Sequence, residues 1–216
     1  MDYFSRHEIS NSDLSDLWLY FSCIKDQSEP IEAYRFGRLI DFMITEPGKI
    51  NYFNYTADDE QYTREEFDIA YKMLEAARKD RFLGPLLPQF VGQKIFLNQN
   101  FNIKWGDFSF DIPVRCKYDL WSDILKLGCD IKSTTATTLK QFEAACWYFG
   151  YPRQRAWYMD ISGVEKDMLI GISKKNYQVF KIPIDRKSEM YIKGRESYSD
   201  LAFKYYSLFY KFNENG

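Results

Sequence analysis

The chain has 216 residues, with 29 Lys or Arg and 31 Asp or Glu, so its formal net charge is −2 at pH 7. This length suits one sizeable core, and the charge excludes the long-range attraction to nucleic acid that a strongly basic protein has. The sequence shows no apolar run long enough to cross a membrane and no signal-peptide pattern at its start. We therefore expect a soluble, cytoplasmic, single-domain protein without a membrane partner.

Cysteines and aromatic residues add little about function on their own. The four cysteines form no Cys-x2-Cys pair, which argues against a zinc or iron–sulfur site, and we expect buried thiols at Cys23, Cys116, Cys129 and Cys146. Aromatic residues make up 19% of the chain. They fill cores and subunit interfaces more often than they stack on unpaired nucleotides, so composition favours a core role.

Residues 1–90 are predicted to be mainly helical. A first helix follows the N-cap candidates Ser10 and Ser12, and its expected apolar stripe comprises Leu14, Leu17, Trp18 and Phe21. A second helix is predicted over residues 31–44, before a Pro-Gly pair. Thr63 and Glu66 match a capping box for a third helix.

Residues 91–185 are predicted to form the central part of the domain. Alternating apolar patterns indicate strands at about 93–103, 107–120 and 124–133. Two helices follow, over 139–149 and from Pro152 to Gly163, then strands at 167–173 and 177–184. A terminal helix is expected within residues 186–216. This order predicts a mixed α/β fold, a central sheet flanked by helices.

Charged residues gather on one face of the predicted central hairpin. Because alternate residues of a strand share a face, Asp130 and Lys132 should lie together, opposite Cys129 and Ile131 and away from the core. Asp119 should lie on the neighbouring strand. Two carboxylates and the backbone carbonyl of Ile131 are suitable ligands for Mg²⁺ or Mn²⁺. Lys132 would then orient a water or stabilise the transition state of phosphodiester hydrolysis.

The order of these residues resembles a known family. Asp119, Asp130-x-Lys132 and Gln154-x3-Tyr158 are similar to the motifs of the PD-(D/E)xK nuclease superfamily, specifically its RecB-like exonuclease branch, which includes RecE (exonuclease VIII) and lambda exonuclease. Two segments resemble that branch's catalytic strand and helix: Cys-Asp-Ile-Lys-Ser-Thr-Thr and Gly-Tyr-Pro-Arg-Gln-Arg-Ala-Trp-Tyr. Residues 9–14 and 36–47 resemble the N-terminal part of the RecE type.

The resemblance implies a restriction-endonuclease-like core and a metal-dependent DNA exonuclease that processes duplex ends for phage or bacterial recombination or repair. It implies that Gln154 and Tyr158 position the scissile strand. It also implies a homo-oligomer and a single-strand annealing protein as a natural partner. An endonuclease of the same superfamily and a catalytically inert DNA-binding or interaction module remain open alternatives.

The chain departs from the family pattern at Asp41, where RecE and RecB types usually carry a metal-binding His. Asp is itself a good Mg²⁺ ligand, and the apolar neighbours of Asp41 argue against free exposure, so we predict a third metal ligand here. The same residue is the best argument for the inert alternative.

Three basic residues are predicted to contact the DNA backbone. Arg153 and Arg155 flank Gln154 near a helix N-terminus, where backbone N–H groups favour phosphate. Lys140 lies after a threonine-rich segment on the preceding helix and is assigned to the same phosphate track.

Overall fold

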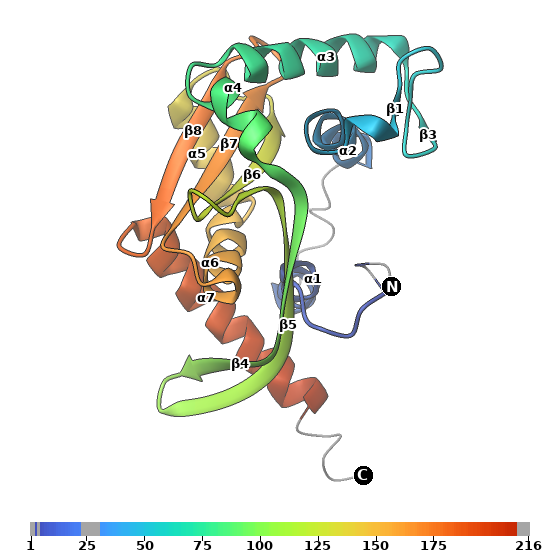
Figure 1. Ribbon diagram of the computed structural model, residues 1–216. Helices are drawn as coiled ribbons and strands as arrows, with labels where there is room; N and C mark the ends of the chain where they lie inside the picture. Colours follow the sequence, from blue (N-terminus) through green and yellow to red (C-terminus); the bar gives the residue numbers. More distant parts are fainter. Residues whose placement is uncertain (1–2, 4, 23–30, 211–216) are drawn as a thin grey trace.

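The computed structural model describes residues 3, 5–22 and 31–210 and has a mixed α/β architecture (Figure 1). Its five-stranded sheet has the order β4-β5-β6-β7-β8. The strands are β4 (Val91–Trp105), β5 (Phe108–Ser122), β6 (Leu127–Thr134), β7 (Lys166–Ser173) and β8 (Val179–Asp185). β6 and β7 pair in parallel and the other neighbours pair antiparallel. β6, which carries the Asp-x-Lys motif, is therefore the central strand.

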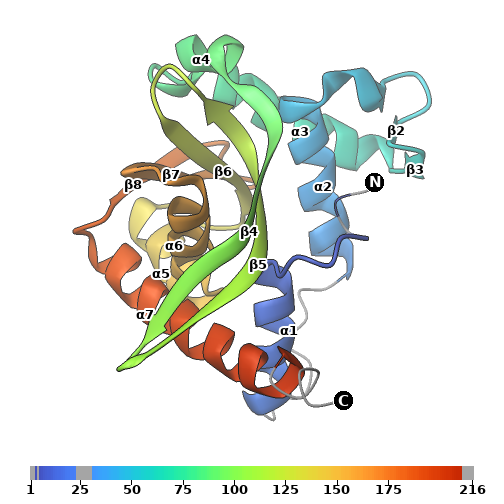
Figure 2. The ribbon, with the colours of Figure 1, turned by 60° about the horizontal axis from the view of Figure 1, so that its bottom comes forward.

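Helices cover both faces of the sheet (Figures 1 and 2). One face is covered by α5 (Leu139–Tyr148), α6 (Tyr151–Ser162) and α7 (Glu189–Tyr205), and the other by α2 (Ile31–Thr45) and α3 (Arg64–Lys79). Helix α1 (Asn11–Ser22) packs against α6 and α7. The short elements are η1 (Pro47–Lys49), α4 (Leu83–Leu86), η2 (Leu87–Gln89) and the π-helical η3 (Tyr206–Tyr210).

The two faces of the sheet each have a hydrophobic core. Trp157 of α6 and Tyr198 of α7 belong to the first, together with Leu169 of β7. Leu39 of α2 and Ile131 of β6 belong to the second, with residues of α3. Since α2 and β6 share a core, the N-terminal helical region is held against the central strand.

The expected fold class is confirmed, and two local features differ from what the sequence patterns indicate. Residues 50–61 form a small antiparallel sheet of β1 (Ile50–Asn51), β2 (Thr56–Ala57) and β3 (Glu60–Gln61), which the sequence patterns did not predict. In α1, Leu14 and Leu17 are buried as expected, but Trp18 and Phe21 are 40% and 47% exposed. The buried stripe of α1 is therefore narrower than its apolar pattern.

Capping and turn residues fix where α3 and α6 begin. Thr63 and Glu66 form the predicted capping box at the start of α3. Gly150 has φ +69, a left-handed conformation that glycine adopts easily. It separates the end of α5 from the start of α6 at Tyr151, and Pro152 lies in the first turn of α6. This sharp corner aims the first turns of α6 at the sheet.

Three of the cysteines, Cys116, Cys129 and Cys146, are buried free thiols, as expected. Cys23 and residues 211–216 lie outside the described residues. No helix in the described part of the chain has the length and apolarity needed to span a membrane.

Candidate active site

The site forms where β5 and β6 separate. Their backbone pairing ends at Leu120 and Cys129, and beyond this point the Asp119 carboxylate accepts the Ile131 backbone N–H at 2.8 Å. The N–H and C=O of one strand residue point to the same edge, so the carbonyl of Ile131 faces the same gap. The separation thus brings together the Asp119 carboxylate and the Ile131 backbone carbonyl. Both groups belong to the predicted ligand set.

Asp130 lies between two cations. Its carboxylate is 2.7 Å from the Lys132 ammonium and 2.6 Å from the Arg155 guanidinium. The predicted pairing of Asp130 and Lys132 on one side of β6 is therefore present. The expectation that Asp130 points away from the protein interior is wrong, because the residue is only 2% exposed.

Arg155 is the buried centre of this ion-pair network. It has no exposed surface, and its second carboxylate partner is Asp167 of β7, at 3.1 Å. The rings of Tyr118 and Tyr158 lie 5.0 and 4.4 Å from its guanidinium carbon. Arg155 cannot reach a DNA backbone from this position, so the predicted phosphate contact is wrong; its contacts instead fix the orientation of Asp130.

Asp41 reaches the same cleft from α2. Its neighbours Leu39 and Ile40 are fully buried, which holds this turn of α2 against the sheet. The Asp41 side-chain oxygen Oδ1 is buried and has no hydrogen-bond partner among the described residues. An acceptor left unsatisfied in this way is costly unless a proton or a cation reaches it.

The carboxylates of the cleft repel one another. Burial, followed by the charge of Asp130, raises the pKa of Asp119 to about 7. Burial and then the charge of Asp119 also raise the pKa of Asp41 well above its ordinary value. Burial opposes the charge on Lys132, yet Asp130 and the other anionic neighbours raise the Lys132 pKa overall. The site therefore holds excess negative charge that a bound cation would relieve.

Gln154 and Tyr158 line the cleft from one face of α6, as their spacing predicts. The Gln154 oxygen Oε1 is buried without a hydrogen-bond partner in the described chain. Tyr158 is 8% exposed, and burial raises the pKa of its hydroxyl, which therefore remains protonated. Both side chains therefore lie in the same cleft as Asp119 and Asp130.

The cleft that unites these groups has a volume of about 850 Å³. Asp41, Asp119, Asp130, Lys132, Gln154 and Tyr158 all line it. Three basic residues that the motif analysis did not assign also line the cleft: Arg38, Lys49 and Lys117. Arg38 and Lys49 pair with exposed carboxylates near β2, so they also fasten the small sheet beside the cleft.

A divalent cation fits the donors that face this cleft. Within the described residues, no group of three or more His, Cys, Asp or Glu side chains is arranged to hold a metal ion by itself. Mg²⁺ commonly uses one or two carboxylates and keeps several waters, so Asp119, Asp130 and the carbonyl of Ile131 are the donors that could hold one here. The unsatisfied oxygen of Asp41 makes that residue available as a further ligand.

The remaining predicted DNA contacts lie outside the cleft. Arg153 is 8% exposed and its guanidinium donates to Asn11 and Ser15 of α1. Lys140 is exposed in the first turn of α5. Asp167 was missed by the sequence analysis because it belongs to a strand without a motif; the parallel pairing of β7 with β6 brings it close to Arg155.

Compared with protein-family models and with curated proteins, the chain has no match. Among solved structures it is similar to a phage-related exonuclease from Haemophilus somnus 129PT, with 12% identity, a TM-score of 0.42, and coverage of 94% of this chain and 95% of the other. It is also similar to the protein SSO0001, with 13% identity, a TM-score of 0.38, and coverage of 95% and 90%. At these scores neither similarity bears on activity.

Proposed function

We propose that the chain is a divalent-metal-dependent nuclease that hydrolyses DNA phosphodiester bonds, acting as an exonuclease on duplex ends. The observation that carries the proposal is the convergence of Asp41, Asp119, Asp130 and Lys132 on one cleft from α2, β5 and β6. Even beside Lys132, burial and repulsion make the ionised forms of Asp41 and Asp119 unfavourable, and a bound metal cation would stabilise them. A lysine beside the carboxylates suits a phosphate substrate.

Each residue has a role that follows from its position. A bound Mg²⁺ or Mn²⁺ would neutralise phosphoryl oxygens and lower the pKa of a water. Asp119, Asp130 and the Ile131 carbonyl would hold the cation, with Asp41 as a further ligand. The Lys132 ammonium, 2.7 Å from Asp130, would stabilise negative charge on the reacting phosphate. Gln154 and Tyr158 would hold the scissile strand through the amide and the protonated hydroxyl.

The exonuclease assignment follows the resemblance of the Asp-x-Lys strand and the Gln-x3-Tyr helix to the RecB-like branch. The same resemblance supports a role in phage or bacterial recombination or repair, a homo-oligomeric assembly and a single-strand annealing protein as partner. An endonuclease shares the metal-binding core and differs in how its loops admit DNA. The cleavage products separate these two activities.

The test is incubation of the purified protein with end-labelled linear duplex and with closed circular duplex, in Mg²⁺, Mn²⁺ or EDTA. We expect metal-dependent degradation of the linear DNA alone. Asp119→Asn and Lys132→Met are the preferred inactive controls, since Asp130 supports a buried arginine and its removal endangers folding. Cleavage of the circle would favour an endonuclease, and absence of any cleavage would favour the inert binding module.

A further inference from the structure

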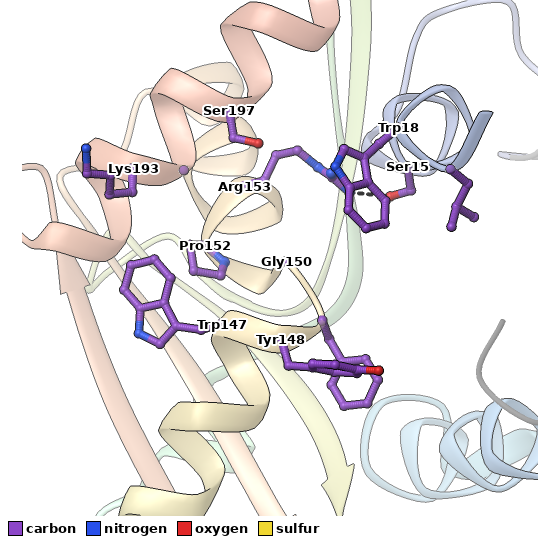
Figure 3. Close-up of a pocket in the computed structure, with 12 residues that line it drawn as sticks. Ser15, Trp18, Trp147, Tyr148, Gly150, Pro152, Arg153, Lys193 and Ser197 are labelled. Carbon is purple, nitrogen blue, oxygen red and sulfur yellow. Dashed lines mark hydrogen bonds between the residues drawn. The ribbon is translucent and has the colours of Figure 1, made fainter. Parts of the chain in front are cut away.

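A second groove lies beside the active-site cleft, bounded by α1, the α5–α6 corner and α7 (Figure 3). Its volume is about 380 Å³, within the range of small-ligand sites. Four aromatic residues line it, and each is at least 40% exposed: Trp18, Trp147, Tyr148 and Phe149. Aromatic rings exposed together at one groove are unusual for a surface that faces only water.

The groove is continuous with the cleft. Residues that line both the groove and the part of the cleft containing Asp41, Lys132 and Gln154 are Ser15, Leu19, Phe149 and Gly150. The first turn of α6 connects the two sites directly, because Arg153 lines the groove and the next residue, Gln154, lines the cleft. A strand bound in the cleft can therefore continue into the groove.

Arg153 supplies a buried positive charge without a negative partner. Its guanidinium Nε donates to Asn11 Oδ1 at 3.1 Å. Its Nη2 donates to Ser15 Oγ at 2.5 Å (Figure 3), and both acceptors are neutral. No carboxylate among the described residues forms an ion pair with Arg153, and burial lowers its pKa to about 10. Buried charges are normally paired, so this geometry favours an anion from outside the chain.

The charge of the groove is complementary to phosphate. No acidic residue of the described chain lines it, and the other charged residue that does is Lys193 of α7, whose ammonium pairs with Glu196 at 2.9 Å. Exposed aromatic faces bind nucleobases of any sequence, while an arginine beside them binds the backbone. The groove therefore combines the two features used to hold unpaired nucleic acid.

We propose that this groove binds an unpaired nucleotide of the DNA strand next to the active site, with its phosphate on Arg153 and its base stacked on Trp18 or Trp147. The proposal rests on the proposed nuclease function and extends it, because an enzyme that degrades one strand of a duplex end leaves nucleotides unpaired beside its site. It assigns single-stranded DNA as a ligand of this chain.

The experiment measures binding of a fluorescein-labelled single-stranded oligothymidylate by anisotropy in EDTA, so that no cleavage occurs. Whichever of Trp18 and Trp147 carries the base, its replacement by Ala should weaken binding roughly 5- to 150-fold, the range for one lost stacking contact. Arg153→Gln should weaken binding and reduce its salt dependence, and Arg153→Lys should recover part of both. Trp105→Ala is the matched control, since Trp105 is also 40% exposed but stacks on Phe203 away from the groove.

Unchanged oligothymidylate affinity in Trp18→Ala, Trp147→Ala and Arg153→Gln would overturn the proposal. It would also be overturned if the tryptophan variants bound normally but changed the sedimentation mass, since the groove would then join copies of the chain. Cleavage of blunt linear duplex in Mg²⁺ is measured in parallel. If the wild type cleaves DNA and the groove variants bind oligothymidylate normally, only the groove proposal is refuted. If the groove variants bind more weakly and the wild type does not cleave DNA, only the nuclease proposal is refuted.

Discussion

At the residue scale, Arg155 connects stability to function. It is fully buried and holds Asp130 from one side while Asp167 holds Arg155 from the other. These contacts are close ion pairs without well-aligned hydrogen bonds. Burial opposes the charge of Arg155, and its two carboxylate partners raise its pKa overall. The network fixes the position of Asp130 before any ligand arrives.

Replacing Arg155 should be strongly destabilising. Arg155→Met leaves two buried carboxylates without their shared cation, so we expect the free energy of unfolding in urea to fall by about 3–5 kcal/mol. Arg195→Met is the control, because Arg195 is 57% exposed and its pair with Asp160 spans 3.7 Å; a change of about 0.5 kcal/mol or less is expected there. Equal effects in the two variants would contradict the role assigned to Arg155.

Asp41 should contribute to cleavage rather than to folding. Asp41→Asn removes one of three mutually repelling carboxylates, so the metal-free protein should be at least as stable as the wild type in thermal unfolding. Cleavage of linear duplex should fall by about 100-fold, the size of effect seen when one electrostatic group of a site is lost. Asp41→His, which introduces another residue type that binds divalent metals, should keep activity. Exposed Glu32 on the same helix provides the control Glu32→Gln. Full activity of Asp41→Asn would show that Asp41 does not contribute to cleavage.

At the scale of elements, α6 joins the active-site cleft, the buried ion-pair network and the aromatic groove. Gln154 and Tyr158 face the cleft, Arg155 faces the network and Arg153 faces the groove. The Gln-x3-Tyr spacing predicted the first of these faces because residues four apart on a helix share a side. It did not predict the burial of Arg155, which depends on the approach of β7 and Asp167.

The long, regular elements were predictable from sequence and the short ones were not. The capping box identified α3, and the alternation of apolar and polar residues identified β5 and β6. These patterns mark the start of a helix and the buried face of a strand. The strands β1, β2 and β3 are two residues long each, too short for any periodicity. Trp18 fits the apolar spacing of α1 but is exposed, because spacing does not tell how wide a face the rest of the protein covers.

Close packing of α6 on α7 should be sensitive to one glycine. A Cβ added at Gly194 of α7 would lie 2.0 Å from the Pro152 carbonyl oxygen, a backbone atom that cannot turn aside. Gly194→Ala should therefore lower the free energy of unfolding by about 1–3 kcal/mol and reduce cleavage by displacing α6. Gly48→Ala, with no atom within 4 Å of the added Cβ, should leave both unchanged. Wild-type stability of Gly194→Ala would show that the helices separate easily.

At the scale of the whole molecule, the site connects parts of the chain that are distant in sequence. Asp41 belongs to the N-terminal helical region, and Asp119 and Asp130 belong to the central sheet. A cation held by these residues would bridge α2 to the sheet. Metal binding should then stabilise the folded molecule as a unit, because the unfolded chain does not hold these ligands together.

Thermal unfolding in increasing Mg²⁺ or Mn²⁺ measures this coupling without any DNA. At a metal concentration about 100 times the Kd, the stabilisation is about 2.7 kcal/mol, which for a chain of this size corresponds to a rise in Tm of roughly 5–10 °C. EDTA should reverse the rise, and NaCl at matched ionic strength should not reproduce it. Asp119→Asn should lose most of the metal-dependent rise while keeping the Ile131 hydrogen bond through its amide oxygen. An equal rise in the wild type and in Asp119→Asn would place the cation elsewhere in the molecule, and the carboxylates of the cleft would then need another explanation.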